Sequence, residues 1–313
     1  MLREKTADGL YAAVIGGVNM DIGGQSFLPL ILSDSNPGKV RTSPGGVGRN
    51  IAHNLQLLGL PVSLIAAFGE DLYARIILDS CRGLGIDTKN AVMVPNEATS
   101  SYLYLADHTG EMHLAVSDME ICRFLTPETL EEKLPVIRGA IALVLDTNIP
   151  AETIAWICRQ VRVPIFADPV SVSKAEKLKP VLSELHTLKP NRLEAELLTG
   201  IRITDDDGLN RAADALLESG VKQVFITLGR EGVLAEDGKQ RIRLPALPEV
   251  PVNTTGCGDA FMAALVWAYA KGLNVEESAR AGLAAASIAM AVSETVNSAM
   301  CEEKLLEKMN RSG

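Results

Sequence analysis

The sequence predicts an α/β protein with a mostly parallel central sheet, because two kinds of segment alternate along the chain. Short apolar runs of the kind found in buried strands are followed by segments in which apolar residues recur with helical spacing. Two stretches, about 21–44 and 92–118, interrupt this alternation with the pattern of exposed strands. We therefore predict helices on both faces of the central sheet and a small second sheet, formed by the two stretches, that acts as a lid.

The N-terminal half contains two strand–helix pairs and both lid stretches. Each predicted helix ends at a glycine, and a turn at residues 107–110 separates the strands of the second lid stretch. The predicted elements are, in order, a strand at 11–18, exposed strands at 21–43, a helix at 47–58, a strand at 62–67, a helix at 72–84 and exposed strands at 91–116.

The C-terminal half is more regular and ends in three helices. The pair Thr126-Pro127 has the N-cap and first-position pattern of a helix start. The predicted elements are strands at 141–145, 163–167, 185–188 and 224–227, helices at 151–161, after residue 191 and at 206–219, an antiparallel patch at 232–244, and helices at 256–271, 275–292 and 302–309.

Composition excludes several classes of protein. The 313 residues are 47% hydrophobic and carry a net charge of −9, whereas a nucleic-acid-binding domain is expected to have a basic patch. Five scattered cysteines favour a reduced cytoplasmic protein over a disulfide framework or a zinc site. Residues 1–10 lack a signal-peptide pattern and no apolar run is long enough to span a membrane, so we expect a soluble protein with no membrane partner.

The segment with the clearest chemistry is NTTGCGDA, residues 253–260, which directly precedes an apolar helical run. Gly256 and Gly258 permit a tight turn with exposed N–H groups, and the helix that starts here adds its own free N–H groups and positive dipole end. Such a site binds a phosphate or stabilises the charge that develops during its transfer. Asp259 would repel a phosphate unless it has another task, and removing a proton from an attacking hydroxyl is such a task.

A structural interpretation of the same segment is that Thr255 or Asp259 only caps the helix and that the glycines serve packing. The segment is not a P-loop, because the pattern GxxxxGK[ST] occurs nowhere in the chain. Residues 45–48, GGVG, do not have the GxGxxG spacing of a dinucleotide-binding fingerprint either, which argues against a dehydrogenase.

Four motifs, in order along the chain, resemble those of the ribokinase-like (PfkB) carbohydrate kinases. They are PGGVGRNIA at 44–52, KPNRLE at 189–194, TLGREG at 227–232 and NTTGCGDAF at 253–261, with NMD at 19–21 after the first strand. The resemblance spans essentially the whole chain. It implies a single ribokinase-like domain over residues 1–313, with a three-layer α/β/α architecture and a β-sheet lid, and an ATP-dependent kinase that uses Mg²⁺.

The resemblance also implies roles for particular residues. The catalytic set is Asp259 as base with the backbone amides of Gly256, Cys257 and Gly258. The acceptor-binding set is Asn19, Asp21, Gly45, Gly46 and Asn50, to which the lid residues Ser101 and Tyr102 and the strand-terminal Asp146 are added as candidates. The nucleotide-binding set is Asn191, Thr227, Gly229, Gly232 and Thr254, and Glu194 and Asp168 are expected to organise the metal.

Several of these residues also have ordinary structural interpretations. Asn191 and Glu194 have the spacing of a reciprocal N-terminal helix cap, Asp21 could belong to an Asx turn, Tyr102 could be an ordinary strand tyrosine, and Asp168 could belong to a turn before a proline. Cys257, where relatives often have alanine, is interpreted as a small filler and not as a nucleophile.

Two departures from the family pattern bear on the ligands. Asn253 stands where many relatives have an aspartate associated with a monovalent cation, so activation by K⁺ is in doubt. Val47 stands where kinases of sugar phosphates tend to have lysine, which favours a neutral acceptor.

Within the family, segments such as SDSNPGK (33–39), TSSYL (99–103) and HTLKPNRLEAE (186–196) are most similar to the pseudouridine kinase subgroup. This implies 5′-phosphorylation of pseudouridine. The alternatives are a kinase for another neutral sugar or nucleoside, such as ribose or adenosine, and a non-catalytic nucleoside-binding relative. The exposed edges of the lid sheet could pair in a homodimer.

Overall fold

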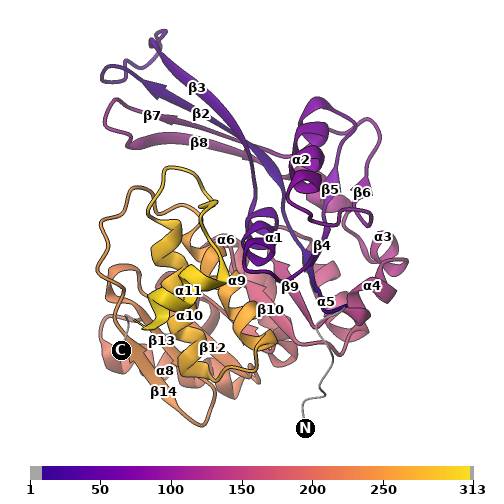
Figure 1. Ribbon diagram of the computed structural model, residues 1–313, viewed down its shortest axis with the longest axis vertical. Coiled ribbons are helices and arrows are strands. Elements are labelled where there is room, and N and C mark those ends of the chain that lie inside the picture. Colours follow the sequence, from indigo (N-terminus) through magenta and orange to yellow (C-terminus); the bar gives the residue numbers. More distant parts are fainter. Residues whose placement is uncertain (1–8, 311–313) are drawn as a thin grey trace.

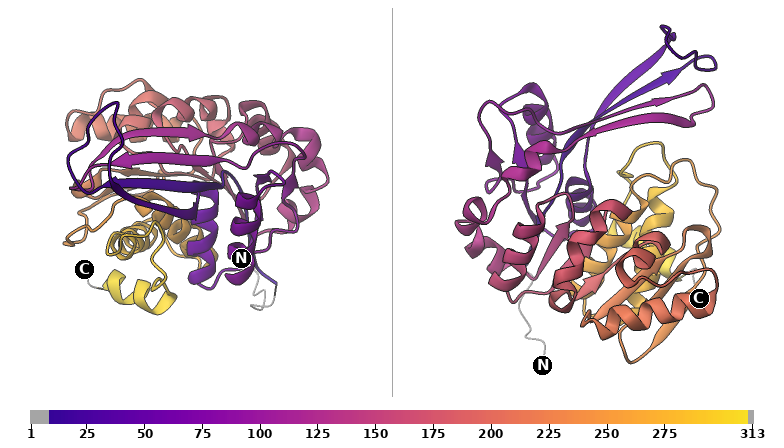
Figure 2. Two further views of the ribbon diagram at one scale, coloured as in Figure 1. Left: turned by 90° about the horizontal axis from the view of Figure 1, so that it is seen from above. Right: turned by 180° about the vertical axis from the view of Figure 1, so that it is seen from behind.

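The computed structural model describes residues 9–310 of the chain. The expectation about a signal peptide falls mostly on residues 1–8, which lie outside the described residues, as do residues 311–313. A central sheet lies between two layers of helices, and a second sheet projects away from this body (Figures 1 and 2). None of the helices between residues 9 and 310 is long and apolar enough to cross a membrane.

The central sheet has eight strands, and its register confirms the predicted parallel arrangement for most of them. The first six strands of the sheet in chain order pair in parallel, whereas the last two add an antiparallel edge. In spatial order the strands are β14 (Arg241–Leu244), β13 (Val233–Glu236), β12 (Gln223–Thr227), β11 (Thr187–Leu188), β10 (Ile165–Asp168), β9 (Ala142–Asp146), β1 (Ala12–Ile15) and β4 (Val62–Ile65).

The two helical layers bury the two faces of this sheet. One layer contains α3 (Pro127–Glu131), α4 (Leu134–Gly139), α5 (Ala151–Gln160), α6 (Val172–Ala175), α7 (Arg192–Thr199) and α8 (Asp206–Glu218). The other contains α1 (Val47–Leu57), α2 (Leu72–Gly83), α9 (Cys257–Ala270) and α10 (Val275–Ala289), against which α11 (Glu302–Asn310) packs. Helix α9 is buried along almost its whole length, which explains its apolar sequence.

The second sheet has the strand order β3-β2-β7-β8, with β2 (Asn19–Ser26), β3 (Gly38–Gly45), β7 (Ser101–Ala106) and β8 (Met112–Asp118). These strands come from the two stretches that interrupt the alternation. The predicted second stretch begins too early, however. Val92–Met93 forms β6, which pairs with β5 (Ala67–Phe68) in a separate small sheet, because the amides at 92 and 94 donate to carbonyls of the strand that continues β4.

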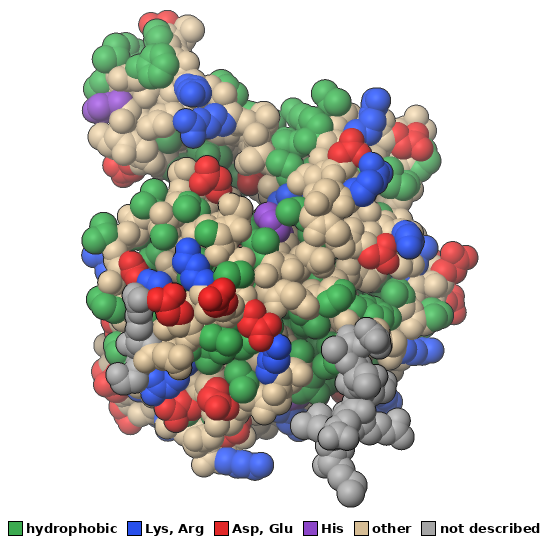
Figure 3. Space-filling model, viewed as in Figure 1, with side chains coloured by type: hydrophobic (Ala, Val, Ile, Leu, Met, Phe, Trp, Pro, Cys, Tyr) green, Lys and Arg blue, Asp and Glu red, His purple; other side chains and the backbone are tan. Residues whose placement is uncertain are grey.

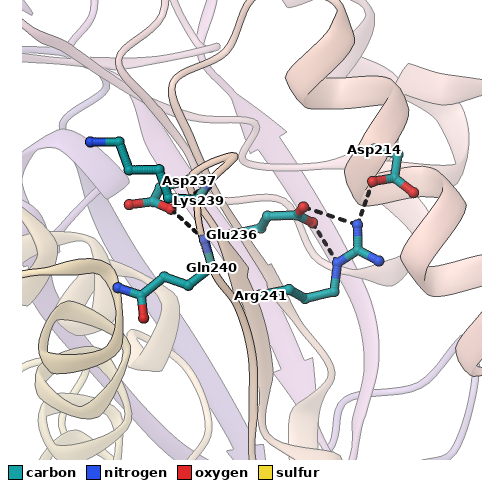
Figure 4. Close-up of polar contacts among 6 residues, drawn as sticks. All are labelled: Asp214, Glu236, Asp237, Lys239, Gln240 and Arg241. Carbon is teal, nitrogen blue, oxygen red and sulfur yellow. Dashed lines mark hydrogen bonds and ion pairs between the residues drawn. The ribbon is translucent and has the colours of Figure 1, made fainter.

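The hairpin β13–β14 is fixed to the body by ion pairs (Figure 4). Arg241 donates to both carboxylate oxygens of Glu236, at 2.7 and 2.9 Å, and also pairs with Asp214 of α8. At the turn, the backbone amide of Gln240 donates to the Asp237 carboxylate at 3.0 Å. Because β13 pairs with β12 and β14 pairs with β13, the predicted antiparallel patch at 232–244 is part of the central sheet.

The other differences from the expected elements lie at ends and in short turns. The last long helix ends at Ala289 instead of 292. The segment that precedes α9 lies against this end, where the backbone amides of Val252 and Asn253 donate to the carbonyl of Met290. The sequence did not predict the 3₁₀ segments η1 (Glu120–Phe124), η2 (Glu176–Glu184) and η3 (Gly229–Glu231).

Candidate active site

Most of the candidate residues lie at one edge of the central sheet, where the carboxyl ends of the parallel strands meet. Asp146 and Asp168 are the last residues of β9 and β10 and stand directly opposite each other in the register. Lys189 follows β11, and a backbone bridge joins Asn191 to Thr227 at the end of β12. The fold therefore gathers side chains that are up to 81 positions apart within this half of the chain.

The start of α9 has the geometry of an anion site. Gly256 adopts φ = 84°, and a β-carbon there would collide with the carbonyl oxygen of Thr295, so only glycine fits this turn. No side chain caps the helix. The amide of Cys257 donates to the carbonyl of Thr254 at 3.3 Å, and the next N–H groups of the first turn face a ligand without a side-chain cap. An anion placed here would meet these donors and the positive end of the helix dipole.

Asp259 is the third residue of α9 and is almost fully buried, with 9% of its surface exposed. Its Oδ2 accepts a hydrogen bond from Nδ2 of Asn50 at 2.9 Å, although the two residues are 209 positions apart. Burial raises the pKa of Asp259 to about 7, and the negative charge of Asp168 adds to the rise, against the hydrogen bond from Asn50 and the charge of Lys189. A carboxylate with a pKa near neutrality can both accept and release a proton at physiological pH.

The predicted acceptor-binding residues of the N-terminal half lie together. Nδ2 of Asn19 donates to Oδ1 of Asp21 at 2.6 Å, and Asp21 fills the space that a side chain at Gly45 would need. Gly46 adopts φ = 98° in close contact with the backbone of Gly17, and α1 begins immediately after it. The Oδ1 of Asn50 is buried and has no hydrogen-bond partner among the described residues, so a ligand hydroxyl would satisfy it.

The two lid residues point in different directions. Tyr102 is paired with Asp21 in the register of β2 and β7, so the two side chains lie on one face of the second sheet. Ser101 is paired with Met20, which is buried on the opposite face. The side chain of Ser101 therefore does not share a face with Asp21, whereas Tyr102 does.

Asp146 is oriented toward the backbone of the site. Its carboxylate accepts hydrogen bonds from the amides of Gly17 at 2.7 Å and Asn148 at 2.8 Å, and only 1% of the residue is exposed. Burial raises its pKa to about 6 despite these two bonds. This geometry favours a role in holding the turn after β1, which carries Asn19, in place.

Asn191 and Glu194 form the reciprocal cap that their spacing indicates. The amide of Asn191 donates to Glu194 at 2.8 Å, and the amide of Glu194 donates to Asn191 at 2.9 Å. Burial raises the pKa of Glu194, and so does the negative charge of Asp168. The carboxylates of Asp168 and Glu194 thus lie at the same edge of the central sheet, near the starts of α7 and α9.

The predicted nucleotide-side residues line the loops beside this edge. Thr227 ends β12 and donates its amide to the carbonyl of Pro190 at 2.9 Å. Gly229 is the first residue of the short segment η3 and Gly232 directly follows this segment, and both glycines have positive φ. Thr254 is exposed and accepts a hydrogen bond at its carbonyl from the amide of Cys257.

The side chain of Cys257 points away from the anion site. Its Sγ lies 3.6 Å from the carbonyl oxygen of Ala286, and burial raises the pKa of the thiol to about 11. At neutral pH such a thiol is protonated and poorly nucleophilic. The geometry therefore agrees with a packing role for its side chain.

Lys189 is a residue to which sequence reasoning assigned no role. Its Nζ lies 3.2 Å from Oδ2 of Asp168, with both side chains almost fully buried. Burial lowers its pKa, but the negative charges of Asp168 and Glu194 outweigh this effect and the net shift is upward. Its position directly after a buried strand, two residues before a helix cap, was the available signal in the sequence.

The molecule is hollowed between the second sheet and the body (Figure 3). The second sheet overhangs this hollow, and the helices α9, α10 and α11 lie below it (Figure 1). The sheet edge, the start of α9 and the residues of the acceptor cluster thus form one candidate active site with a buried carboxylate beside a set of N–H donors.

Comparisons with known proteins point to a single family. Residues 10–300 match the sequence model described as pfkB family carbohydrate kinase. The chain is 40% identical to the pseudouridine kinase of Escherichia coli K12 over 95% of this chain and 94% of that protein, and 37% identical to the uncharacterized sugar kinase YeiI of the same organism over 95% and 82%. The structure of Arabidopsis thaliana ribokinase complexed with ribose and ATP is similar, with a TM-score of 0.85, 25% identity and coverage of 96% and 99%.

Proposed function

Because the chain belongs to the pfkB family of carbohydrate kinases, we propose that it transfers the γ-phosphoryl group of ATP to the 5′-hydroxyl of pseudouridine. The family and the ribokinase-like fold make it a kinase for a sugar or nucleoside. The similarity to a pseudouridine kinase over nearly the whole length of both chains supports the finer choice of acceptor. Position 47 is a valine, whereas kinases of sugar phosphates tend to have a lysine there, and this difference agrees with a neutral acceptor.

One observation carries the proposal: the hydrogen bond between Asn50 and Asp259 beside the uncapped start of α9. Asn50 belongs to the acceptor cluster and Asp259 to the anion site. The hydrogen bond therefore links the residues proposed to hold the acceptor with the site proposed to hold the transferring phosphoryl group. The unsatisfied Oδ1 of Asn50 would accept a hydrogen bond from the acceptor, next to the carboxylate that removes the proton.

The reaction follows from these positions. The acceptor hydroxyl loses its proton to Asp259 as its oxygen bonds to the γ-phosphorus, while the bond between that phosphorus and ADP breaks. The amides of the first turn, at Gly256, Cys257 and Gly258, stabilise the negative charge on the transferring group, and that of Cys257 gives up its bond to the carbonyl of Thr254 to do so. Asn19, Asp21 and Asn50 orient the sugar, and closure of the second sheet as a lid would exclude water that otherwise competes as acceptor.

The residues present also fit a magnesium ion. Asp168 and Glu194 supply buried carboxylate oxygens, which are the ligands that Mg²⁺ prefers. Both are already partly engaged, Asp168 with Lys189 and Glu194 with the helix cap, so contact through water molecules suits them. When bound, the ion would neutralise charge on the nucleotide phosphates, which lie along the residues Asn191, Thr227, Gly229, Gly232 and Thr254 in this proposal.

An acceptor panel tests the function. The chain is incubated with ATP, Mg²⁺ and pseudouridine, uridine, adenosine, ribose, fructose or fructose 6-phosphate, and ADP release is measured with product identification by mass spectrometry. We expect the highest kcat/KM with pseudouridine. A higher kcat/KM with ribose would favour the second candidate, a kinase of free ribose, which the likeness to the ribose-bound structure supports. Turnover of none of the compounds would overturn the proposal.

A homodimer through the second sheet is a further part of the proposal. The register aligns Val40, Leu103, Leu105, Leu114 and Val116 on one face, each of them at least 39% exposed. The register also places the exposed Asp118 on this face, beside Ser101. The face spans roughly 20 Å in each direction, about 800 Å² in total for two copies, which corresponds to a weak dimer. Light scattering after gel filtration should give twice the mass of one chain, and Leu114→Lys should give a monomer.

A further inference from the structure

A buried arginine lies where the second sheet leaves the body of the protein. Arg49 is the third residue of α1, and only 5% of it is exposed. Arginine is almost never buried this completely unless it is paired. Among residues 9–310, however, no carboxylate forms an ion pair with its guanidinium group, and its Nε is buried without a hydrogen-bond partner. A cation in this position calls for a role beyond that of a surface charge.

The guanidinium group of Arg49 connects α1 with β3 and α2. Its Nη1 donates to the carbonyl of Pro44 on β3 at 3.0 Å, and its Nη2 donates to Oγ of Ser80 on α2 at 2.8 Å. The residue after Pro44 is Gly45, where a β-carbon would collide with the carboxylate of Asp21. Arg49 therefore holds the short piece of backbone against which Asp21 packs.

The charges of Arg49 and Asp21 also act on each other. Burial raises the pKa of Asp21, whereas the hydrogen bond from Asn19 and the positive charge of Arg49 lower it. The carboxylate in turn attracts the guanidinium group. An ionised carboxylate only accepts hydrogen bonds and has room for several donors. With one of its oxygens bonded to Asn19, Asp21 in this state can still receive hydroxyl groups of a ligand.

The other titratable groups near this pair do not supply the same charge. Burial and the charge of Arg49 lower the pKa of His53, one turn further along α1, to about 4, and burial raises the pKa of the Cys81 thiol on α2. Both are therefore neutral at pH 7. Two more groups share the face of Asp21 on the second sheet, Tyr102 on β7 and the exposed Arg41 on β3. Solvent screens the charge of an exposed arginine, so the cation that acts on Asp21 is Arg49.

We propose that Arg49 is a positioning residue that fixes Asp21 against Gly45 and keeps its carboxylate ionised, so that Asp21 accepts hydrogen bonds from the hydroxyl groups of the acceptor. The inference rests on the proposed kinase function and deepens it. Arg49 itself does not touch the acceptor. Its effect on acceptor binding therefore depends on pH and requires the carboxylate of Asp21.

Binding of pseudouridine at different pH values tests this role. Calorimetric titrations between pH 4.5 and 8 use the full chain with Asp259→Asn, which removes another titrating carboxylate of the site and prevents turnover. Adding Arg49→Gln removes the charge that opposes the effect of burial, so the pKa of Asp21 should rise. The pH at which acceptor affinity is half lost should then move upward by about one unit, and below both midpoints binding should be up to about tenfold weaker.

Arg49→Lys is the conservative variant, because it keeps the positive charge. Its midpoint should remain near that of the Asp259→Asn protein, whereas a purely structural role would give Arg49→Lys and Arg49→Gln similar defects at every pH. An unmoved midpoint in Arg49→Gln would overturn the proposal. An equal shift in Arg49→Lys would do the same, because the charge would not be its cause.

Asp21→Asn identifies the group that titrates. In its presence the pH-dependent loss of affinity should disappear, and Arg49→Gln should cause no further shift, because the two residues act as a unit. If Arg49→Gln still moves a midpoint when Asp21 is asparagine, a different group such as His53 carries the effect and the proposal is wrong.

Ser80→Asp keeps the test decisive if Arg49→Gln folds poorly. Ser80 is only half-buried, and its Oγ already accepts from Nη2 of Arg49. A carboxylate at this position would offset the charge of Arg49 while the arginine and its bond to Pro44 remain. The midpoint should therefore move upward as in Arg49→Gln, whereas the matched neutral variant Ser80→Asn should leave it in place. Equal midpoints in Ser80→Asp and Ser80→Asn would contradict the proposal.

The outcomes also separate this inference from the kinase proposal. If Arg49→Gln and Asp21→Asn are non-additive in urea unfolding at pH 8 but no acceptor binds, the two residues interact, and the proposed function and the role in acceptor binding are both wrong. If wild type phosphorylates pseudouridine and Arg49→Gln leaves the midpoint of acceptor binding unmoved, the function remains and the role of Arg49 is wrong.

Discussion

Replacing Asp259 by asparagine should slow the reaction and stabilise the protein at the same time. The substitution preserves the size of the side chain, and the amide oxygen can still accept the hydrogen bond from Asn50. It removes the proton acceptor of the proposed mechanism and also the negative charge that burial disfavours. A purely structural role for Asp259 as a helix cap would predict a loss of stability instead.

The two magnitudes follow from general-base catalysis and from the pKa of Asp259. Loss of a general base lowers kcat about 10²- to 10⁴-fold, which raises the barrier by about 3–5 kcal/mol. The folded-state pKa of about 7 lies above the ordinary aspartate pKa of 3.8, so the folded protein holds this proton more tightly than the unfolded chain. The wild type therefore loses stability as pH rises from about 4 to 7, by about 4 kcal/mol in total.

The free energy of unfolding from urea titrations at pH 5 and pH 8 measures this effect. The advantage of Asp259→Asn should be about 4 kcal/mol at pH 8 and about 2 kcal/mol at pH 5. Asp79→Asn is a matched control, because Asp79 is an exposed carboxylate on α2 and should change stability by less than about 0.5 kcal/mol. Near-normal kcat, or an advantage that does not grow with pH, would refute the reasoning.

Three further predictions concern neighbouring features. Asn50→Ala should raise the KM for the acceptor and shift the pH profile of kcat/KM to higher pH. In wild type the hydrogen bond from Asn50 lowers the pKa of Asp259, so removal of this bond should raise that pKa. An unchanged profile would contradict this. K⁺ in place of Na⁺ should change kcat less than about twofold, because the amide of Asn253 donates to the carbonyl of Ser293 at 3.0 Å and an amide holds a cation less well than a carboxylate; a large activation would show a cation site. Val170→Gly should raise the free energy of unfolding by about 1 kcal/mol in urea, because Val170 adopts φ = 63°, a conformation that strains a β-branched residue; a loss would show that its side-chain packing outweighs the strain.

The sequence predicts the fold well where local signals and global packing agree. The central strands and the long helices have buried apolar runs or helical spacing, and they appear within a few residues of the predicted ends. The prediction places Val92–Met93 in the wrong sheet because a strand of two residues carries no periodicity. Its pairing with β5 accompanies the burial of the next apolar residue, Val94, in the core. The turns η1 and η2 likewise have no pattern that distinguishes them from loops.

The candidate site is predictable residue by residue only where a motif carries a local constraint. The glycine at 256 and the cap at Asn191 and Glu194 are such cases, since φ and spacing are properties of short segments. The bond between Asn50 and Asp259 and the placement of Lys189 behind Gly258 join distant parts of the chain. No local pattern encodes them. These contacts depend on the three-dimensional arrangement of the central sheet, whose register brings the ends of its strands together.

Several buried carboxylates of the site lower the stability of the folded protein. Burial raises the pKa values of Asp21, Asp146, Glu194 and Asp259, so each of them destabilises the folded chain when it is ionised. A protein selected for stability alone would replace them with neutral side chains. Their presence around an uncapped helix start is therefore better explained by ligands that complete the charge balance. In the proposed function, the hydroxyl groups of the acceptor and the metal ion of the nucleotide would supply donors and positive charge to these carboxylates.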